Sequence, residues 1–270
     1  AADYYDKGLG KSLGYLVGAL VLGTAFPHFL KTFTGTENLP WRWVIVATSL
    51  FAFMGGLLIL LFVPNGPFRK AKGKFNFNAV FRISSNKKLR SAAFGYFGHM
   101  WELYTFWAFV PIILAAYKLS FPTSDFVVSF WSFIIIGIGG VSCVLGGYIS
   151  EVLGVKKTAT IALLLSGICC LAFPFIFLQA STVVLITFLC FWGIVVVADS
   201  PLFSTLVAGN APPEIKGTAL TIVNSIGFAI TIVSLQLINY LHKIEPVYSL
   251  SLLAIGPALG LWGLFTKKRA

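Results

Sequence analysis

Eight long apolar stretches dominate this sequence of 270 residues, and each is about twenty residues or longer with almost no charge inside it. A helix rises about 1.5 Å per residue, so about twenty apolar residues cross the roughly 30 Å hydrocarbon core of a bilayer. The sequence therefore predicts an all-α integral membrane protein with eight transmembrane helices. The expected spans are 12–33, 41–63, 91–117, 124–149, 158–178, 182–207, 217–241 and 247–266.

The composition supports this class. Hydrophobic residues make up 57% of the chain and charged residues 11%, whereas a soluble domain carries roughly 25% charged residues. A transmembrane barrel would show segments of about ten residues with alternating hydrophobicity. The run Leu57-Leu58-Ile59-Leu60-Leu61 does not alternate, so the pattern favours helices spanning a lipid bilayer.

The net charge of +11 follows from the placement of the cations. With the N-terminus on the inner side, eight spans place 16 of the 20 lysines and arginines on that side. The four on the other side are Lys31, Arg42, Lys118 and Lys243. Because cytoplasmic loops are enriched in these residues, the sequence predicts a plasma or inner membrane protein with both termini of this chain in the cytoplasm. The charge then reports orientation and gives no reason to expect a nucleic-acid partner.

The sequence gives no sign of a bound metal or cofactor. All four cysteines lie inside predicted spans, and the adjacent Cys169 and Cys170 point about 100° apart on a helix. We interpret Cys143, Cys169, Cys170 and Cys190 as small apolar packing residues. No Gly-x-x-x-x-Gly-Lys-Ser/Thr loop is present, so we expect no ATP-driven step.

The spacing of the spans divides the chain into two helices and six. Most connections are about five to ten residues long, but residues 64–90 form a longer, polar and basic connection. Long connections in compact bundles are commonly functional or join domains. The sequence thus predicts two helices of one bundle in 1–63, a cytoplasmic linker in 64–90 and a six-helix bundle in 91–270.

The connection between the fourth and fifth spans has a recognisable pattern. It reads Gly147-Tyr148-Ile149-Ser150-Glu151-Val152-Leu153-Gly154-Val155-Lys156-Lys157. This resembles the signature loop of the major facilitator superfamily, Gly-x-x-x-Asp-Arg-x-Gly-Arg-Arg/Lys-Lys. Gly147, Gly154, Lys156 and Lys157 match it, Glu151 stands in for the aspartate, and the first cation is absent. The alternative is an ordinary cytoplasmic turn with lysines on the inner side.

The resemblance extends to the order of the spans. In that superfamily a long cytoplasmic loop separates two six-helix bundles, and the second copy of the signature loop lies between helices eight and nine. Numbering the present spans as helices five to twelve puts 64–90 and 147–157 at those two positions. Lys216-Gly217 then begins helix eleven, as Lys7-Gly8 begins helix five. The resemblance implies a superfamily fold that lacks its first four helices, and a switch loop containing Glu151.

Three glycines in the first span have spacings that permit close helix contact. Gly14, Gly18 and Gly23 are four and five residues apart, and small residues at such spacing let helix backbones approach. We therefore expect them to pack against another helix.

Three titratable residues lie deep inside predicted spans, where charging a group costs at least about 2.5 kcal/mol. Glu102 lies eleven residues beyond Ser91, so about 16 Å into the membrane and close to its midplane. His99, three residues earlier, shares its helical face, and Trp101 and Tyr104 add ring surfaces and hydrogen-bond donors. The protonation of Glu102 would respond to burial and to the charge on His99. This predicts a proton-coupling or substrate site, with a structural hydrogen bond between His99 and Glu102 as the alternative.

The third residue, Asp199, precedes Pro201 in the sixth span. A proline removes a backbone donor and leaves the carbonyl of Val197 free. A broken helix beside an acid suits an ion or substrate site. Equally, Asp199 could order a gate or pair with Lys216.

The resemblance implies a secondary active transporter that moves a small solute across the lipid bilayer by alternating access. Proton coupling through Glu102, assisted by His99, is the expected mechanism, and no enzymatic activity is expected. The alternative is a membrane-embedded lipid-modifying enzyme that uses His99 and Glu102. A channel is disfavoured because the sequence shows no ring of charge and no carbonyl filter signature.

Overall fold

The computed structural model describes Tyr4 and residues 8–33, 40–64, 66–67, 85–179 and 181–265. These residues are almost entirely helical, and none of them lies in a strand. The longer helices are α1 (Leu9–Phe33), α2 (Trp41–Phe62), α4 (Lys87–Ser120), α5 (Val128–Leu153), α6 (Val155–Gln179), α7 (Thr182–Ala198), α8 (Ser200–Asn210), α9 (Lys216–His242) and α10 (Ile255–Phe265). Two 3₁₀ turns, η1 (Pro213–Ile215) and η2 (Tyr248–Ala254), precede α9 and α10.

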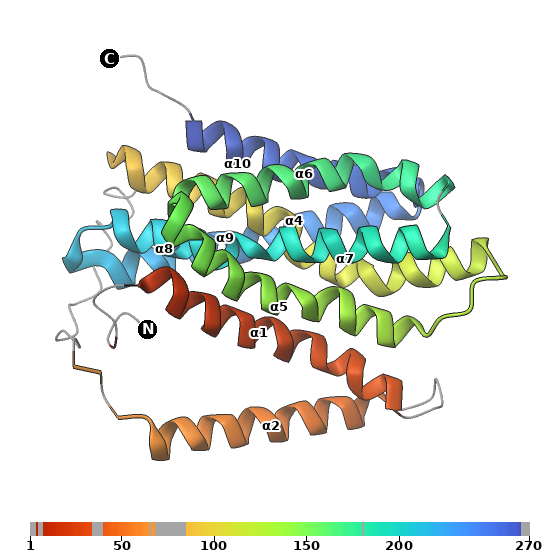
Figure 1. Ribbon diagram of the computed structural model, residues 1–270, viewed down its shortest axis with the longest axis horizontal. Helices are drawn as coiled ribbons and strands as arrows, with labels where there is room; N and C mark the ends of the chain where they lie inside the picture. Colours follow the sequence, from red (N-terminus) through yellow and green to blue (C-terminus); the bar gives the residue numbers. More distant parts are fainter. Residues whose placement is uncertain are drawn as a thin grey trace.

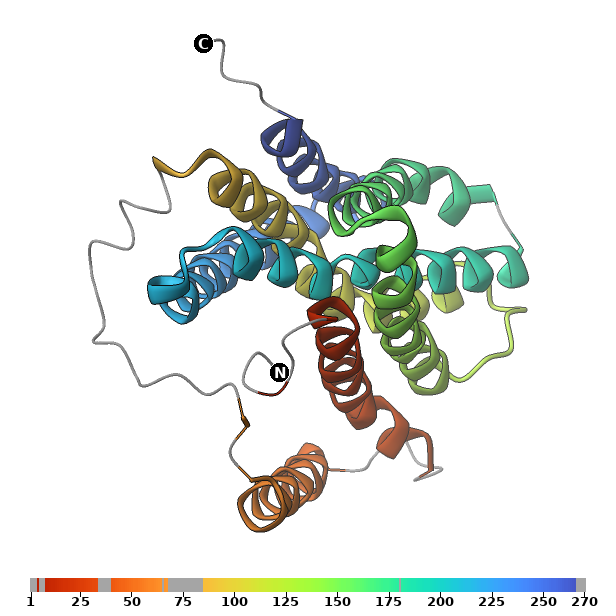
Figure 2. The ribbon, with the colours of Figure 1, turned by 60° about the vertical axis from the view of Figure 1, so that its left-hand side comes forward.

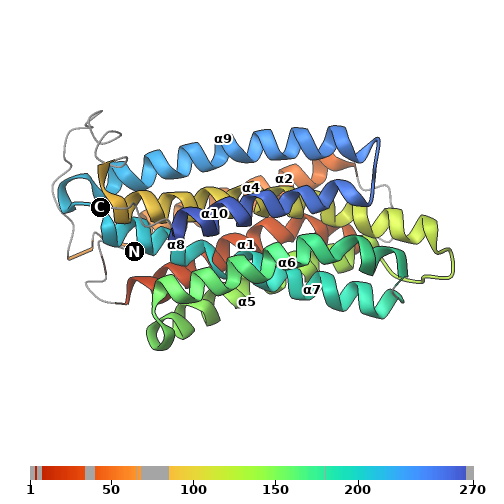
Figure 3. The ribbon, with the colours of Figure 1, turned by 90° about the horizontal axis from the view of Figure 1, so that it is seen from above.

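Eight spans in the described chain are long and apolar enough to cross a membrane. This confirms the predicted all-α membrane fold. The helices lie side by side along the long axis of the molecule (Figure 1). The start of α1, the end of α8 and the end of α10 lie at one end, as alternating short connections require (Figure 3).

The third span begins earlier than its apolar residues predict. Asn86 precedes α4, and its side-chain oxygen accepts hydrogen bonds from the backbone of Lys88 at 3.0 Å and of Leu89 at 3.2 Å. A polar residue capping a helix start satisfies backbone donors that have no partner within the helix. The cap therefore extends the helix four residues beyond the predicted start at 91.

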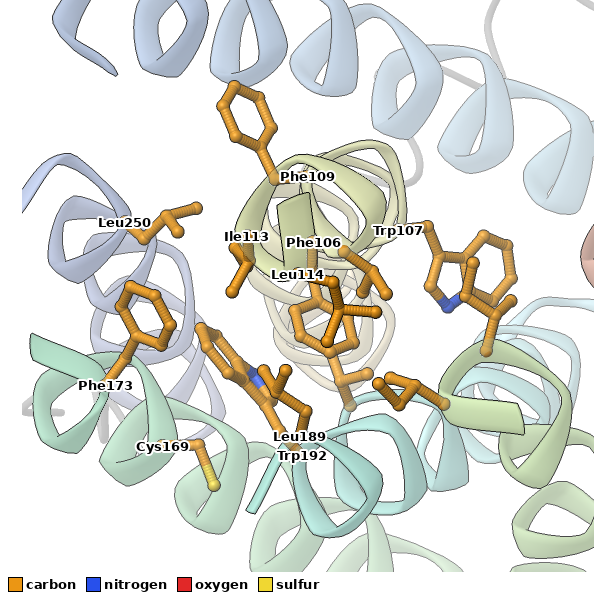
Figure 4. Close-up of a cluster of buried hydrophobic side chains, with 14 of the residues drawn as sticks. Phe106, Trp107, Phe109, Ile113, Leu114, Cys169, Phe173, Leu189, Trp192 and Leu250 are labelled. Atoms are coloured by element: carbon orange, nitrogen blue, oxygen red, sulfur yellow. The ribbon is translucent and has the colours of Figure 1, made fainter. Parts of the chain in front are cut away.

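The packed core surrounds α4. Phe106 on α4 lies 4.5 Å, centroid to centroid, from the ring of Trp192 on α7, and Phe173 on α6 lies 5.8 Å from the same indole. Figure 4 shows these rings together with Leu250 around the central helix. Half of the most apolar stretch of α4 is buried. The helix that carries His99 and Glu102 therefore lies at the centre of the six-helix bundle.

Helices α1 and α2 are attached differently. Helix α1 packs along α5, and α2 lies on the far side of α1, away from the rest of the bundle (Figures 1 and 2). Val44 is the only α2 residue buried within the described chain. The predicted linker falls largely on residues 68–84, which lie outside the described residues.

Candidate functional site

Glu102 is fully enclosed between α4, α6 and α7, and three donors surround its carboxylate. The indole Nε1 of Trp192 donates to Oε1 at 2.7 Å, and the Cys170 thiol lies 3.3 Å from the same oxygen. The hydroxyl of Ser166 donates to Oε2 at 2.9 Å. Because no cation among the described residues takes part, neutral donors hold the carboxyl group, an arrangement that can hold a charge at the centre of a bundle.

The Ser166 hydroxyl gives this site a second hydrogen-bonding arrangement. Its oxygen lies 2.9 Å from Glu102 Oε2 and 3.1 Å from the carbonyl oxygen of Leu163. A hydroxyl has one proton to donate and can also accept. A protonated Glu102 can therefore donate to Ser166 while Ser166 donates to Leu163, so both protonation states of the acid have partners.

His99 does not pair with Glu102, so the alternative of a structural hydrogen bond between them is wrong. Its Nδ1 lies 2.8 Å from Oδ1 of Asp199, and both side chains are almost wholly buried. Positions three apart on a helix still differ in direction by about 60°. That angle is enough to turn Glu102 toward α6 and α7 and His99 toward the junction of α7 and α8. Asp199 likewise pairs with His99 and not with Lys216.

The sixth span breaks where Pro201 predicts. Helix α7 ends at Ala198, α8 begins at Ser200, and Asp199 joins them. The carbonyl of Val197, which Pro201 cannot engage, instead lies 3.5 Å from the thiol of Cys143 on α5. The break thus places a buried acid where the helix ladder is interrupted.

The outer atoms of this pair have no partner among the described residues. His99 Nε2 and Asp199 Oδ2 are buried and make no hydrogen bond to any of them. Buried polar atoms without partners are costly and rare. The junction of α7 and α8 therefore retains hydrogen-bonding capacity for a proton, a water molecule or a solute.

The two aromatic candidates lie on different sides of α4. The Trp101 indole points toward η2, where its Nε1 lies 3.4 Å from the carbonyl of Leu252. Tyr104 instead lies between Trp107 and Phe228 of α9, with ring centroids 5.2 and 5.5 Å away. Neither contacts the Glu102 carboxylate through a hydrogen bond, so the predicted residues form separate clusters.

The glycines of α1 lie against α5, with one exception. A Cβ on Gly14 would lie 2.7 Å from the carbonyl oxygen of Cys143, and one on Gly18 would lie 2.6 Å from that of Gly140. Such distances exclude any side chain, so the two backbones touch here. A Cβ on Gly23 would meet nothing within 4 Å, so Gly23 takes no part in this contact.

The signature loop lies at the end of the same contact. The carboxylate of Glu151 lies 2.6 Å from the ammonium of Lys11 on α1, and both side chains are partly exposed. Gly147 faces the α1 backbone, where a Cβ would lie 3.0 Å from the carbonyl oxygen of Gly10. The acid and first glycine of the loop therefore both face α1.

The other residues of the signature loop do not face α1. Gly154 has φ +86°, a left-handed conformation that favours glycine, and it turns the chain from α5 into α6. Lys156 donates to the carbonyl of Leu264 at 2.7 Å, so it caps the end of α10. Lys157 is exposed.

Sequence reasoning missed the partners of the acids. Cys170 was interpreted as a packing residue, but its thiol contacts Glu102. Ser166 and Cys170 are four residues apart and so share one face of α6, a polar pair inside a span that could have been noticed. Nothing in the sequence linked Trp192 to Glu102. Among the described residues, no three His, Cys, Asp or Glu side chains are grouped so that they could hold a metal ion.

An apolar bundle of this kind, with acids and a histidine enclosed around its central helix, defines a polytopic membrane protein that holds ionisable groups inside the bilayer. Residues 1–235 match the family model of the Major Facilitator Superfamily. The chain belongs to this superfamily, a family of membrane transporters, which confirms the resemblance seen in residues 147–157. No curated protein matches the sequence significantly.

Proposed function

We propose that the chain is the part of a secondary active transporter that comprises helices five to twelve, and that it moves a small solute by proton-coupled alternating access. In this proposal residues 1–63 belong to one bundle, 64–90 link the bundles and 91–270 form the other. The observation that carries it is the enclosed acid Glu102, which has hydrogen-bond partners in both protonation states. Such a group can take up and release a proton as the surrounding helices move.

Alternating access is supported by the contact between α1 and α5. Its middle consists of touching backbones at Gly14 and Gly18, and Lys11–Glu151 joins the two helices at one end. Two helices that meet along glycines can tilt without unlocking interdigitated side chains. The ion pair then acts as a latch that favours the state closed on its side.

The His99–Asp199 pair is proposed to tie proton binding to this movement. It connects α4, which carries Glu102, to the break between α7 and α8. A change in its charge or hydrogen bonding would alter how α8 is held. In this scheme Glu102 carries the coupled proton, and His99 and Asp199 transmit its effect.

A direct test of the proton site is infrared spectroscopy of the purified full-length protein at acidic and alkaline pH. We expect a carboxyl C=O band that responds to pH in the wild type and disappears in Glu102→Gln. The same substitution at the exposed Glu245 is the matched control and should leave this band in place. A band unchanged in Glu102→Gln would overturn the assignment.

The same variant also tests the role of Glu102 in coupled transport. Glu102→Gln imitates the protonated acid and cannot release a proton, so it should abolish accumulation driven by a pH gradient while preserving solute exchange. His99→Gln should do less and mainly shift the pH dependence. Undiminished accumulation in Glu102→Gln would place the coupling site elsewhere.

The proposed orientation has both termini of this chain in the cytoplasm. Single cysteines at Lys156 and Lys243 test it, because these positions lie at opposite ends of the bundle. A membrane-impermeant thiol reagent applied to intact cells should label the cysteine at 243 and not the one at 156. The reverse pattern would invert the topology.

No observation favours the lipid-modifying enzyme. It would need His99 and Glu102 to act together near a membrane edge, whereas both are enclosed and engage different partners.

A further inference from the structure

Helix α9 has three distinct faces. One face is buried against the bundle: Val223, Gly227, Thr231, Ser234 and Ile238. A second face is exposed and apolar: Ile226, Val233, Leu237 and Tyr240. The third, which we call the amide stripe, includes Asn224, Ser225, Phe228, Ile232, Gln236 and Asn239, and the half-buried Leu235 lies at its edge toward the bundle. At about 100° per residue the stripe occupies about a third of the helix circumference, so its polar residues are gathered on one side.

The polar side chains of the stripe lack partners. Ser225, Gln236 and Asn239 are exposed, Asn224 is half-buried, and none hydrogen-bonds to another described residue. Three of them lie within about 11 Å of the helix midpoint, inside the roughly 15 Å half-thickness of a hydrocarbon core. Lipid cannot satisfy amides and hydroxyls at that depth. The apolar face of the same helix suits lipid, and the amide stripe does not.

An aromatic run continues the stripe onto α4. The ring of Phe228 lies 5.5 Å from that of Tyr104, which in turn lies 5.2 Å from Trp107. Trp107 is 5% exposed, and its Nε1 has no hydrogen-bond acceptor among the described residues. An indole donor that is buried without a partner indicates a missing acceptor. Flat rings beside amides suit a ligand with both an apolar face and hydrogen-bonding groups.

The lack of formal charge on this surface limits the class of ligand that it can bind. None of the amide stripe, Tyr104 and Trp107 carries a formal charge, and Glu102 and the His99–Asp199 pair face other neighbours inside the bundle. Binding an ion here would therefore remove its hydration without supplying a counter-charge. Amides and an indole can instead replace the hydrogen bonds that water makes to hydroxyl groups.

We propose that the amide stripe of α9, with Tyr104 and Trp107, is the solute-binding surface, and that the solute is uncharged with a hydroxylated rim and a flat apolar face. Sugars and nucleosides share this chemistry. The inference rests on the proposed transport function, since a transporter requires a water-filled path within the membrane. It deepens that function by naming the residues and the class of solute.

Accessibility to water is tested first, in membranes containing the full-length protein and without a pH gradient. Single cysteines are introduced at Ser225 and Gln236, with Ile226→Cys and Leu237→Cys as neighbours at matched depth on the apolar face. A charged, water-soluble methanethiosulfonate should modify positions 225 and 236 at least about tenfold faster than 226 and 237, because the charged reagent does not enter hydrocarbon. Equal rates at the paired positions would overturn the proposal. Ile232→Cys on the stripe and Val233→Cys on the apolar face form a replacement pair near the helix midpoint if either stripe variant fails to fold.

The solute class is tested by protection of the Gln236→Cys variant. D-glucose and uridine represent the two sources of the proposed chemistry, and lactate and choline represent anions and cations of similar solubility. Slower modification with D-glucose or uridine supports the proposal and identifies the source. Protection by lactate or choline alone, or by none of the four, overturns it. Because these measurements do not depend on proton coupling, they can succeed where the Glu102→Gln experiment fails, and the reverse.

Discussion

The contact between α1 and α5 and the network around Glu102 hold helices together in opposite ways. Along α1 and α5 two backbones touch at glycines. Polar links join Lys11 to Glu151 and Tyr15 to Tyr148 at one end, and Thr32 lies 3.2 Å from Ser129 at the other. Around Glu102 every link is enclosed, and the donors come from two different helices.

This difference predicts which contact moves and which stays fixed in the proposed transport cycle. The links of Lys11 and Tyr15 are exposed and exchange readily with water, and a smooth glycine surface offers little resistance to tilting. An enclosed network loses its hydrogen bonds without replacement when its helices separate. We infer that in the proposed alternating access the six spans from α4 to α10 move as one unit, and that α1 moves against α5.

The largest effect is expected from a bulky substitution that prevents movement at the glycine contact between α1 and α5. Gly18→Leu forces a side chain against the Gly140 carbonyl, since even a Cβ would lie 2.6 Å from that oxygen. Overpacking of this kind separates the helices, and we expect transport to fall at least about tenfold while the protein still reaches the membrane. Solute uptake normalised to protein amount measures it. Gly23→Leu is the matched control on the same helix, and an equal loss there would show that the contact is not special.

An intermediate effect is expected in the fixed network. Trp192→Phe keeps a ring beside Phe106 but removes the donor 2.7 Å from Glu102 Oε1. We expect a loss of about 1–3 kcal/mol of stability, the usual cost of leaving a buried group short of a partner. Thermal unfolding in detergent measures it, with the exposed Trp43→Phe as control.

A double substitution sharpens this result. If the indole acts through the acid, Trp192→Phe should cost less in a Glu102→Gln background than in the wild type. Additive costs would mean that Trp192 stabilises the bundle through ring packing alone.

The smallest effect is expected at the ion pair that ends the contact between α1 and α5. Glu151→Gln removes the ion pair with Lys11, but both side chains are partly exposed and screened by solvent. We expect the transport rate to change by a factor of about two to five, and the difference to shrink at high salt. Exchanging the charges, with Lys11→Glu and Glu151→Lys together, should restore the wild-type rate. Failure of the exchange combined with salt-independent loss would assign Glu151 a role other than pairing.

The spans could be predicted to within a few residues because bilayer thickness sets the length of an apolar helix. Two discrepancies lie where local chemistry adds to that length, at the Asn86 cap, or interrupts it, at Asp199. The fourth span is instead shifted by four residues, to Val128–Leu153. The superfamily could be recognised because its signature loop combines a turn glycine with charges at fixed spacing. Gly154 requires the left-handed turn, and Lys156 binds the end of α10.

The pairing of the buried polar groups could not be predicted in the same way. Spacing along one helix indicates which side chains share a face, but neighbouring helices decide which of them meet. His99 and Glu102 differ in direction enough for Asp199 to meet one and Trp192 the other. The amide stripe was within reach of sequence reasoning, because its polar residues repeat with helical period inside a span.

The break at Asp199 divides the sixth span into two helices, α7 and α8, that a single residue joins. A continuous helix transmits rotation about its axis from one membrane surface to the other through its hydrogen-bond ladder. Pro201 removes one hydrogen bond of that ladder, and the carbonyl oxygen of Val197 instead lies next to the Cys143 thiol on a neighbouring helix. Helix α7 is thus tied to α5 through Val197 and Cys143, and its junction with α8 is tied to α4 through Asp199 and His99, so contacts with neighbouring helices hold the span in place where its own hydrogen bonds are interrupted.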